Sequence, residues 1–574
     1  MWSMDETANV PRIEVQDIDH LGIVAGIIDE TGLVEEIDRR VGTHPQERVS
    51  CGRAVKAMIL NGLGFLSAPL YLFEEFFSGK ATEHLIGPGI EPEHLNDDRL
   101  GRVLDKLFEA GLTELFVGIA SKAAERFGLP EAKSVHLDTT SFHLHGRYDN
   151  DDDDDDDDDD ETEGGKEEER EPEEIHITHG YSRDHRPELK QFVVDLLSTG
   201  EGGIPLFFRV ADGNETDQAV FAELIEEFQA RLNLDALFVA DAALYSAENL
   251  ASLSELRWLC RVPRTLAEAR RALAETPREA FMHSAAHEGY RFAEAKSEHG
   301  GVKQRWLLIH SEELEKAARQ RLERRLLRRE RELDGELKRL LLARKVSFAC
   351  RADAEEAVET FAAEHLRGKK GYHRLAAASL PEIVEEARYA KPGRPAKGAE
   401  PKEVRYRVAK EVEVERNEAA IEEELERSGR YILATSVLDS GELTNDRLLT
   451  EYKGRHAVEQ GFRFLKDPLF FASSLFVKSP RRVAAIAMVM GLCLLVYALG
   501  ERSLREALAE AGAGIRHQRG KPTRRPTLRW VFQLFQAVHL LKVDGAERIS
   551  NLTEERRSIL GFLVRGCQRY YLLA

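Results

Sequence analysis

An apolar run of 17 residues, Val483 to Leu499 (VAAIAMVMGLCLLVYAL), limits the folding of this chain more than any other feature. This length is at the lower edge of what a membrane-spanning helix requires, so the run must be buried in a bilayer or in a protein core. With 574 residues, the chain is long enough for roughly three or four domains with extensive cores. We therefore expect a core helix and no membrane partner. The alternative is a membrane-attached structural protein.

Charge is distributed unevenly along the sequence. The formal net charge is −21, and residues 149–174 alone contribute −17, from 19 acids and two bases. Residues 478–529 instead contain eleven Lys or Arg against three Glu. The acidic segment has almost nothing apolar to bury, so we expect a disordered, solvated insert. Calcium chelation is the alternative, although no EF-hand spacing is present.

Cysteine usage and the N-terminal sequence bear on location. The five cysteines lie far apart and form no CxxC pair, so neither a zinc site nor a disulfide framework is predicted. The first 15 residues lack the basic and apolar regions of a secretion signal. We therefore expect a cytoplasmic protein.

Residues 1–130 contain apolar residues at steps of three and four, which predicts a helical N-terminal domain. The sequence leaves open whether this domain binds DNA or serves packing and dimerisation. From Ser134 the pattern alternates, which places Asp138 within a strand. Further strands and helices follow to residue 263, and Asp241 comes directly after the apolar strand LFVA. Open α/β sheets place ligand sites at such strand ends.

The remaining sequence suggests three more parts. Residues 264–430 are highly charged and mixed in pattern, which predicts an inserted α+β domain. Residues 431–500 would return to the sheet and carry a polar helix followed by the apolar run. Residues 501–574 are basic and predicted to be helical. The expected fold class is therefore α/β, with a mixed sheet formed by 131–263 and 431–500.

The stretch Tyr452 to Lys466 (YKGRHAVEQGFRFLK) predicts a helix with a distinctive polar face. At ~100° per residue, its polar face carries one acid, one aromatic residue and three cations. These are Tyr452, Arg455, Glu459, Arg463 and Lys466. Such a face suits a carboxylate that holds a metal while its neighbours bind phosphate. A surface helix with i,i+4 ion pairs is the alternative.

Asp138, Asp241 and Glu459 together form a set of three carboxylates on separate rigid elements. Two magnesium ions ~3.5–4 Å apart need oxygen ligands that arrive from different directions. Three such acids would supply these ligands and leave positions open for water, a 3′-hydroxyl and a scissile phosphate.

With these motifs in place, the sequence resembles the DDE transposases of bacterial and archaeal insertion sequences, in the branch marked by Y-x2-R-x3-E-x6-K. Tyr452, Arg455, Glu459 and Lys466 match this pattern at every spacing. HLDTTSF around Asp138 and VADAALYS around Asp241 also resemble the family, as does GKPTRRPTLRWVFQLF near the C-terminus.

The resemblance implies a ribonuclease-H-like core, interrupted by the insertion, that cleaves and joins DNA with two Mg²⁺ or Mn²⁺ ions. It further implies that Asp138 and Asp241 bridge the metals and that Glu459 completes the second site. Tyr452, Arg455 and Lys466 would hold the phosphates of the transposon end. The implied partners are the element's own terminal inverted repeats, target DNA and a second copy of the chain, as a dimer. A domesticated or inactive relative that binds DNA without cutting is the rival.

Three further sets of residues are candidates for a functional role. A hairpin intermediate would need an aromatic residue that stacks on an unpaired base, for which Trp258 and Trp306 are candidates, with core packing as the alternative. His136, His143 and His145 suggest a transition-metal site, but strand histidines more commonly form hydrogen bonds or lie exposed. The basic segment near the C-terminus is a candidate DNA-tracking arm, or a merely solvated surface. Its candidate DNA contacts are Arg516, Lys521, Arg524 and Arg525.

Overall fold

The computed structural model describes most of the chain. The described residues are 13–65, 68–144, 173–181, 186–232, 234–343, 345–366, 371–375, 382–390, 393–395, 397–408, 414–466 and 479–573. The predicted acidic insert 149–174 therefore lies outside the described residues, except for Glu173 and Glu174, and so does His145.

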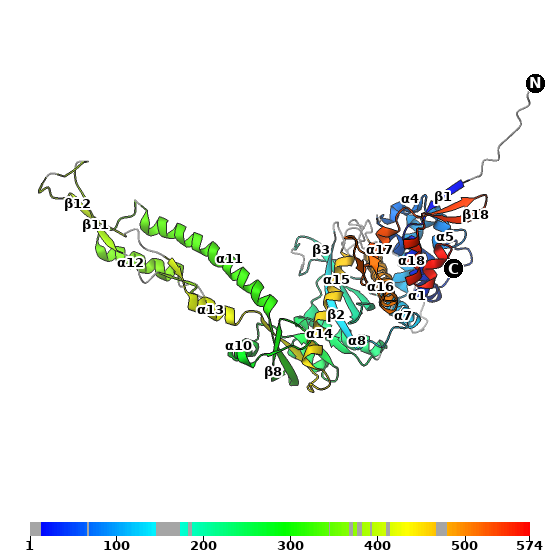
Figure 1. The fold of residues 1–574 in the computed structure, drawn as a ribbon, viewed down its shortest axis with the longest axis horizontal. Helices are drawn as coiled ribbons and strands as arrows, with labels where there is room; N and C mark the ends of the chain where they lie inside the picture. Colours follow the sequence, from blue (N-terminus) through cyan, green and yellow to red (C-terminus); the bar gives the residue numbers. More distant parts are fainter. Residues whose placement is uncertain are drawn as a thin grey trace, which may run out of the picture.

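A nine-stranded mixed sheet forms the centre of the molecule (Figure 1). Its spatial order is β4-β3-β2-β5-β6-β14-β9-β8-β7. The strands are β2 (Ser134–Leu144), β3 (Lys190–Thr199), β4 (Pro205–Ala211), β5 (Leu237–Val239), β6 (Trp258–Arg261), β7 (Met282–His283), β8 (Tyr290–His299), β9 (Val302–Ser311) and β14 (Arg430–Thr435). β3 is antiparallel to β2 and β4, whereas β5 is parallel to both β2 and β6. The predicted mixed α/β sheet is therefore present.

Helices cover both faces of this sheet. One face packs against α8 (Asp217–Leu232) and α9 (Ala247–Ser252), whose apolar residues share a core with Val135 and Leu137 of β2. The other face is covered by four helices. These are α7 (Leu112–Arg126), α14 (Asn445–Gly454), α15 (His456–Leu465) and α16 (Pro480–Glu510). Strand alternation therefore assigns each side chain of β2 to one of two separate cores.

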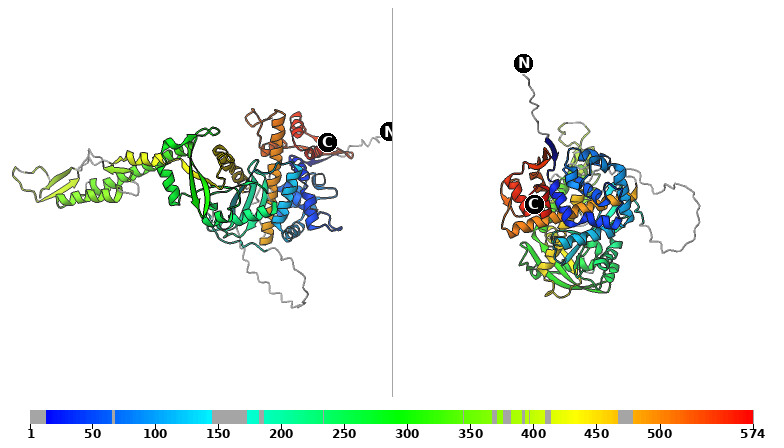
Figure 2. Two further views of the ribbon diagram at one scale, coloured as in Figure 1. Left: turned by 90° about the horizontal axis from the view of Figure 1, so that it is seen from below. Right: turned by 90° about the vertical axis from the view of Figure 1, so that its right-hand side faces the viewer.

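The apolar run lies within α16, which is a core helix. Among the described residues, α16 is the one helix long and apolar enough to cross a membrane, but 78% of its apolar window is buried inside the protein. It packs against α7, β4 and three N-terminal helices, α1 (Leu21–Thr31), α3 (Cys51–Gly62) and α6 (Asp97–Glu109). In Figure 2 it is the long orange helix beside the blue N-terminal helices. The predicted core burial is thus observed.

The N-terminal and C-terminal segments fold together around one hydrophobic core. The other N-terminal helices are α2 (Leu33–Val41), α4 (Phe73–Phe77) and α5 (Thr82–Ile86). The C-terminal elements are α17 (Leu528–Leu534), β17 (His539–Val543), β18 (Ala546–Ser550), α18 (Glu554–Phe562) and α19 (Arg565–Tyr570). β17 pairs with both β18 and β1 (Ile13–Asp17), so the two ends of the chain share a sheet.

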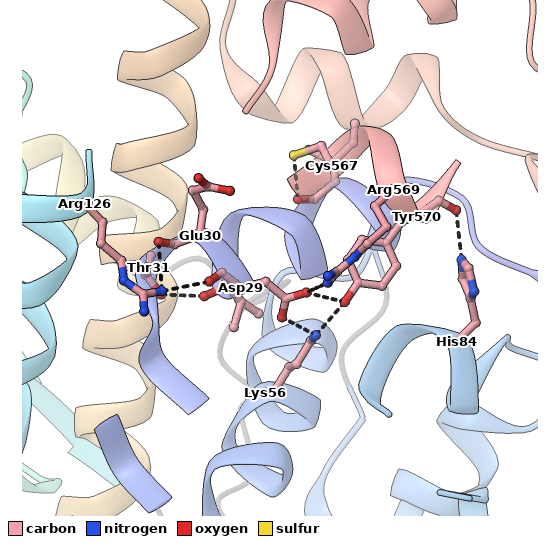
Figure 3. Close-up of polar contacts among 11 residues, drawn as sticks. Asp29, Glu30, Thr31, Lys56, His84, Arg126, Cys567, Arg569 and Tyr570 are labelled. Atoms are coloured by element: carbon pink, nitrogen blue, oxygen red, sulfur yellow. Dashed lines mark hydrogen bonds and ion pairs between the residues drawn. The ribbon is translucent and has the colours of Figure 1, made fainter. Parts of the chain in front are cut away.

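A polar cluster fixes α19 against α1 and α3 (Figure 3). The buried ammonium of Lys56 donates to Asp29 Oδ1 at 2.6 Å and to the Tyr570 hydroxyl at 2.7 Å. That hydroxyl in turn donates to Asp29 Oδ2 at 2.6 Å, and Arg569 also pairs with Asp29. Gly26 permits the close approach, because a Cβ there would lie 2.4 Å from the backbone of Cys567. α19 near the C-terminus therefore packs as part of the N-terminal helical domain.

An elongated arm leaves the sheet after β9 and returns into β14 (Figure 1). Its first helix, α11 (Glu312–Leu337), is capped by Ser311, whose hydroxyl accepts from the Leu314 N–H. The other arm elements are α12 (Arg351–Phe361), β10 (His373–Leu375), β11 (Ile383–Arg388), β12 (Glu403–Val408), β13 (Val414–Arg416) and α13 (Glu418–Glu426). β8 and β9 fall inside the range 264–430 but pair within the main sheet. The chain therefore leaves the sheet after β9 and not at the predicted boundary at residue 264.

Candidate active site

Asp138 lies on β2, and Asp241 follows the neighbouring strand β5 by two residues. β2 and β5 are parallel, with His136 opposite Val239. Continued two residues beyond the end of β5, this register would bring Asp138 level with Asp241. The sequence prediction that Asp241 follows a buried strand is correct, because all three residues of β5 are buried.

Both carboxylates belong to the sheet face covered by α14, α15 and α16. Asp138 shares its side of β2 with Phe142 and Leu144, which pack in the core that contains α16. Asp241 continues the side of β5 that carries Val239, which packs in a core with Leu448 of α14. Alternation along each strand therefore directs both side chains toward the same group of helices.

The predicted helix from Tyr452 to Lys466 is interrupted at Arg455, where α14 ends and α15 begins. At this junction an Arg455 guanidinium nitrogen lies 3.7 Å from Asp138 Oδ1, and the two side chains are only 12% and 15% exposed. The same guanidinium donates to the Tyr452 hydroxyl at 3.4 Å. The break therefore directs Arg455 toward the strand aspartate.

The junction is closely packed against β2. A Cβ at Gly454 would lie 2.6 Å from Cε1 of His136, so only glycine lets the end of α14 approach β2 this closely. His136 is fully buried beneath the junction. Its burial and the nearby Arg455 charge lower the pKa of this histidine from its ordinary value to about 4, so it is neutral at pH 7. His136 thus acts as a packing residue below the site.

Asp241 caps the short helix that follows β5, and its charge acts on a neighbouring side chain of the site. Its Oδ1 accepts from the Ala243 N–H at 2.7 Å. Burial raises the pKa of Tyr452, an effect that Arg455 and Arg261 oppose and Asp241 reinforces. The charges of two arginines and one aspartate therefore act on the Tyr452 hydroxyl.

Comparisons with known proteins agree with this geometry. Residues 137–496, more than half of the chain, match the family model described as Transposase DDE domain. The chain belongs to the DDE transposase family. Residues 13–121 match a second model, described as Domain of unknown function (DUF4277). The predicted family membership is confirmed, and Asp138, Asp241 and Glu459 all fall inside the matched DDE region.

Other comparisons are weaker. No curated protein matches this DDE transposase. One solved structure that it resembles is the "Cryo-EM structure of piggyBac transposase synaptic complex with hairpin DNA (SNHP)". The sequence identity is 9% and the TM-score 0.35, with 95% of this chain and 84% of that chain covered.

Glu459 and Lys466 of the DDE transposase lie on and just after α15, which packs against β2. Glu459 is exposed, whereas the Lys466 ammonium lies 5.6 Å from the centre of the Phe142 ring on β2. Within the described ranges, no group of three His, Cys, Asp or Glu side chains is close enough to share a metal ion. The fold therefore brings Asp138, Asp241, Arg455 and Tyr452 together but does not close a three-carboxylate set.

The donor chemistry of the site nevertheless fits a hard divalent cation. DDE transposases typically use divalent metal ions. Asp138 and Asp241 present carboxylate oxygens from adjacent strands, which are the ligands that Mg²⁺ and Mn²⁺ prefer. Histidine ligation is not supported: His136 is buried against Gly454, and His143 belongs to no metal-binding group among the described residues.

The two tryptophans proposed as base-stacking candidates are core residues of the transposase. Trp258 is 0% and Trp306 2% exposed. The Trp306 indole N–H donates to Gln304 Oε1 at 3.1 Å and to the Tyr245 hydroxyl at 3.2 Å. Neither ring can reach a DNA base in this conformation, so the structure favours the core-packing alternative over base stacking.

The basic C-terminal segment forms an exposed hairpin. β15 (Ile515–Arg516) pairs with β16 (Pro522–Thr523). All four candidate DNA contacts are exposed: Arg516, Lys521, Arg524 and Arg525. The backbone of this hairpin is fixed by the Trp530 indole, which donates to the Arg516 carbonyl at 2.7 Å. Exposure agrees with a DNA-tracking role but also with a solvated surface.

Sequence reasoning missed Arg261, which ends β6. Leu259 is opposite Val239, so Arg261 lies level with Asp241 on the adjacent strand. Its guanidinium lies 5.1 Å from the centre of the Tyr431 ring. A charged residue inside the apolar strand RWLCRV was the available signal. Arg261 therefore adds a second cation to the transposase site.

Proposed function

We propose that this chain cuts DNA at the ends of an insertion sequence and joins the freed 3′-hydroxyl to target DNA. One observation carries the proposal: the parallel β2–β5 register brings Asp138 and Asp241 together within the matched DDE region. Two carboxylates, one on a strand and one directly after the neighbouring strand, beside an arginine, suit phosphoryl transfer rather than a purely structural role.

In this proposal Asp138, Asp241 and Glu459 hold two Mg²⁺ or Mn²⁺ ions. Bound ions of this kind activate a water or 3′-hydroxyl nucleophile and stabilise the leaving oxygen. Arg455 lies close enough to Asp138 to bind a phosphate presented at the same place, and its planar group suits bidentate contact. Tyr452 orients Arg455 through its hydroxyl. Lys466, fixed over Phe142, would contact the adjoining backbone.

The proposed core is ribonuclease-H-like, and the chain is assigned to the Y-x2-R-x3-E-x6-K branch. Support comes from the strand order β4-β3-β2-β5-β6. Three antiparallel strands are followed by two strands parallel to β2, and β2 and β5 supply the aspartates. The motif spacing of Tyr452, Arg455, Glu459 and Lys466 supports the branch.

The proposed partners are the element's terminal inverted repeats, target DNA and a second copy of the chain, in the cytoplasm. Two ends must be held together for joining, which is why a dimer is proposed. The exposed basic hairpin that contains Arg516 and Lys521 is a natural site for backbone contacts. Its Arg524 and Arg525 add two more exposed cations.

A strand-cleavage assay tests this function. Full-length protein is incubated with a duplex that carries the element's inverted repeat, with Mg²⁺, with Mn²⁺, or with a chelator. The proposal predicts a nick at the repeat boundary that requires the divalent ion and is absent from a duplex with a scrambled repeat. Repeat-specific binding without any nick would instead favour the rival, a relative that binds DNA without cutting.

One observation favours that rival. Glu459 is exposed, and the described residues contain no assembled group of three metal-binding side chains. α15 already packs against β2, so an active enzyme would have to turn the Glu459 carboxylate toward Asp138 and Asp241 when metal and DNA bind. A chain that has lost activity would have no such requirement, and the metal dependence of the nick separates the two.

A further inference from the structure

The helix α11 of the arm has one apolar side and is highly charged elsewhere. Its apolar side is buried against the rest of the arm through Leu322, Leu326, Leu333 and Leu337. Two acids flank this buried side and pair with Arg416 of β13: Glu323 at 2.8 Å and Glu330 at 2.6 Å. These two acids of α11 are thus neutralised within the arm.

The opposite side of α11 carries a stripe of five exposed arginines. At ~100° per residue, these five side chains fall within an arc of about 120° that faces away from the buried leucines. We call them the arginine stripe: Arg321, Arg324, Arg325, Arg328 and Arg331. At 1.5 Å per residue, the stripe is about 15 Å long.

The cations of the stripe are largely uncompensated. Arg328 pairs with Glu332 at 3.4 Å, whereas Arg325 lies over the Tyr372 ring, 5.3 Å from its centre. In the part of the chain that the structure describes, Arg321 and Arg331 have no acidic partner. Pairs at i,i+4 are ordinary on a solvated helix, and Arg328 with Glu332 is one of them, as is Lys338 with Asp334 at 2.5 Å. Among the described residues, no ion pair joins the other four arginines of the stripe to an acid, so the stripe keeps an excess of positive charge.

A hollow of about 450 Å³ adjoins the stripe. Its charged lining consists of Arg325, Arg328, Arg329 and Glu332, beside Tyr372, His365 and His373. Glu332 pairs with Arg328 and Arg329, so three guanidinium groups face one carboxylate and the hollow keeps an excess of positive charge.

We propose that the arginine stripe and its hollow bind the phosphate backbone of duplex DNA, independently of base sequence. A duplex carries one negative charge per about 1.7 Å, so a linear row of arginines about 15 Å long matches its charge distribution. Guanidinium groups bind phosphate oxygens in a bidentate manner. The proposal rests on the proposed function for its choice of DNA. α11 begins directly after β9, which pairs with β14, the strand that leads to α14 and the active site.

The test measures DNA affinity of the full-length protein between about 50 and 200 mM salt, on a repeat-bearing and an unrelated duplex. Replacing Arg321 and Arg331 by Gln removes two exposed charges without breaking an ion pair. The slope of log K against log salt should become shallower by about two units, equally on both duplexes. The control variant replaces Arg270 and Arg271 of the exposed α10 (Ala267–Glu275) by Gln and should keep the wild-type slope.

An unchanged slope in the Arg321→Gln, Arg331→Gln variant would overturn the proposal, as would an equal loss in the control variant. Charge-retaining Lys substitutions at 321 and 331 should keep the wild-type slope, which excludes misfolding as the cause of a loss. Repeat-specific cleavage is measured in parallel. If the wild type cleaves but the slope is unchanged, the stripe proposal fails alone; if the slope falls but neither the wild type nor any variant cleaves, the proposed catalytic function fails alone.

Discussion

Arg455 and Asp138 form a nearly buried pair, with 3.7 Å between a guanidinium nitrogen and Oδ1. The break between α14 and α15 places Arg455 there, and Gly454 permits the break. The same carboxylate is a proposed metal ligand. Arginine and a divalent ion are therefore alternative partners of Asp138, and Arg455 compensates its charge when no ion is bound.

Arg455→Gln should destabilise the protein in the absence of divalent ions by about 1–3 kcal/mol. This is less than the loss for a fully buried pair, because both side chains are slightly exposed. Mn²⁺ should then raise the melting temperature more in this variant than in the wild type, since the ion no longer competes with the guanidinium. Calorimetry with and without Mn²⁺ measures both effects.

Asp138→Asn is the control for this experiment and should reduce the Mn²⁺ effect in both backgrounds. Equal Mn²⁺ shifts in the wild type and in Arg455→Gln would show that the arginine and the ion do not share this carboxylate.

Gly454→Ala should disrupt the junction above β2. The added Cβ would lie 2.6 Å from the buried His136 ring and 3.6 Å from the Gly200 carbonyl, so α14 must move. We expect a stability loss of about 1–3 kcal/mol and a larger relative loss of cleavage, because Arg455 is displaced. Gly335→Ala is the matched control: it is also helical, has no neighbour within 4 Å, and should be neutral or slightly stabilising.

Tyr570→Phe should weaken the packing of α19 against the N-terminal helices α1 and α3. It removes the hydroxyl that accepts from Lys56 and donates to Asp29, leaving a buried ammonium with one partner fewer. We expect a loss of about 1–3 kcal/mol in denaturant unfolding. Arg569→Gln is the control, since that side chain is 64% exposed and its pair with Asp29 should contribute at most about 1 kcal/mol. Similar losses in both variants would contradict the role assigned to the hydroxyl.

Protonation of His20 should couple stability to pH. This ring is 2% exposed, its Nε2 lies 2.9 Å from the Leu63 carbonyl, and burial lowers its pKa to about 4. The unfolded chain therefore binds this proton first, near pH 6.5, and stability falls as the pH drops from about 6.5 to about 4. The shift corresponds to about 3 kcal/mol. The folded state has the whole of this stabilisation above pH 6.5.

His20→Gln can still donate to the Leu63 carbonyl but cannot ionise. Its free energy of unfolding should change less between pH 7 and pH 4 than that of the wild type, with a remaining dependence from the buried His136. His44→Gln, at an exposed position, is the control. An identical pH dependence in His20→Gln and the wild type would contradict the assignment.

Local patterns predicted much of the catalytic region. Alternation placed Asp138 in a strand, an apolar tetrad placed Asp241 after one, and the length of the run from Val483 predicted a buried helix. The motif spacing around Glu459 led to the DDE transposase family, which the family match confirms. Each of these signals lies within a few residues of the feature it predicts. The branch and the metal count stay predictions.

Long-range contacts could not be predicted in this way. The junction that interrupts the predicted helix from Tyr452 packs Gly454 against His136, which is more than 300 residues away in the chain. β8 and β9 join the main sheet through pairing with β14, across the whole arm. The sequence also left two roles open for Trp258 and Trp306, and their burial in the assembled sheet favours core packing. Such features require the tertiary structure.

The most direct test of the proposed active site is the cleavage of a repeat-bearing duplex by Asp241→Asn in the presence of Mg²⁺. The matched control is Asp235→Asn, a neutralisation six residues earlier at a side chain that is 93% exposed. If Asp241 is a metal ligand beside Asp138, its Asn variant binds the duplex as the wild type does but leaves it uncut, while Asp235→Asn cuts normally. Cleavage by Asp241→Asn at the wild-type rate would contradict the assignment of this site.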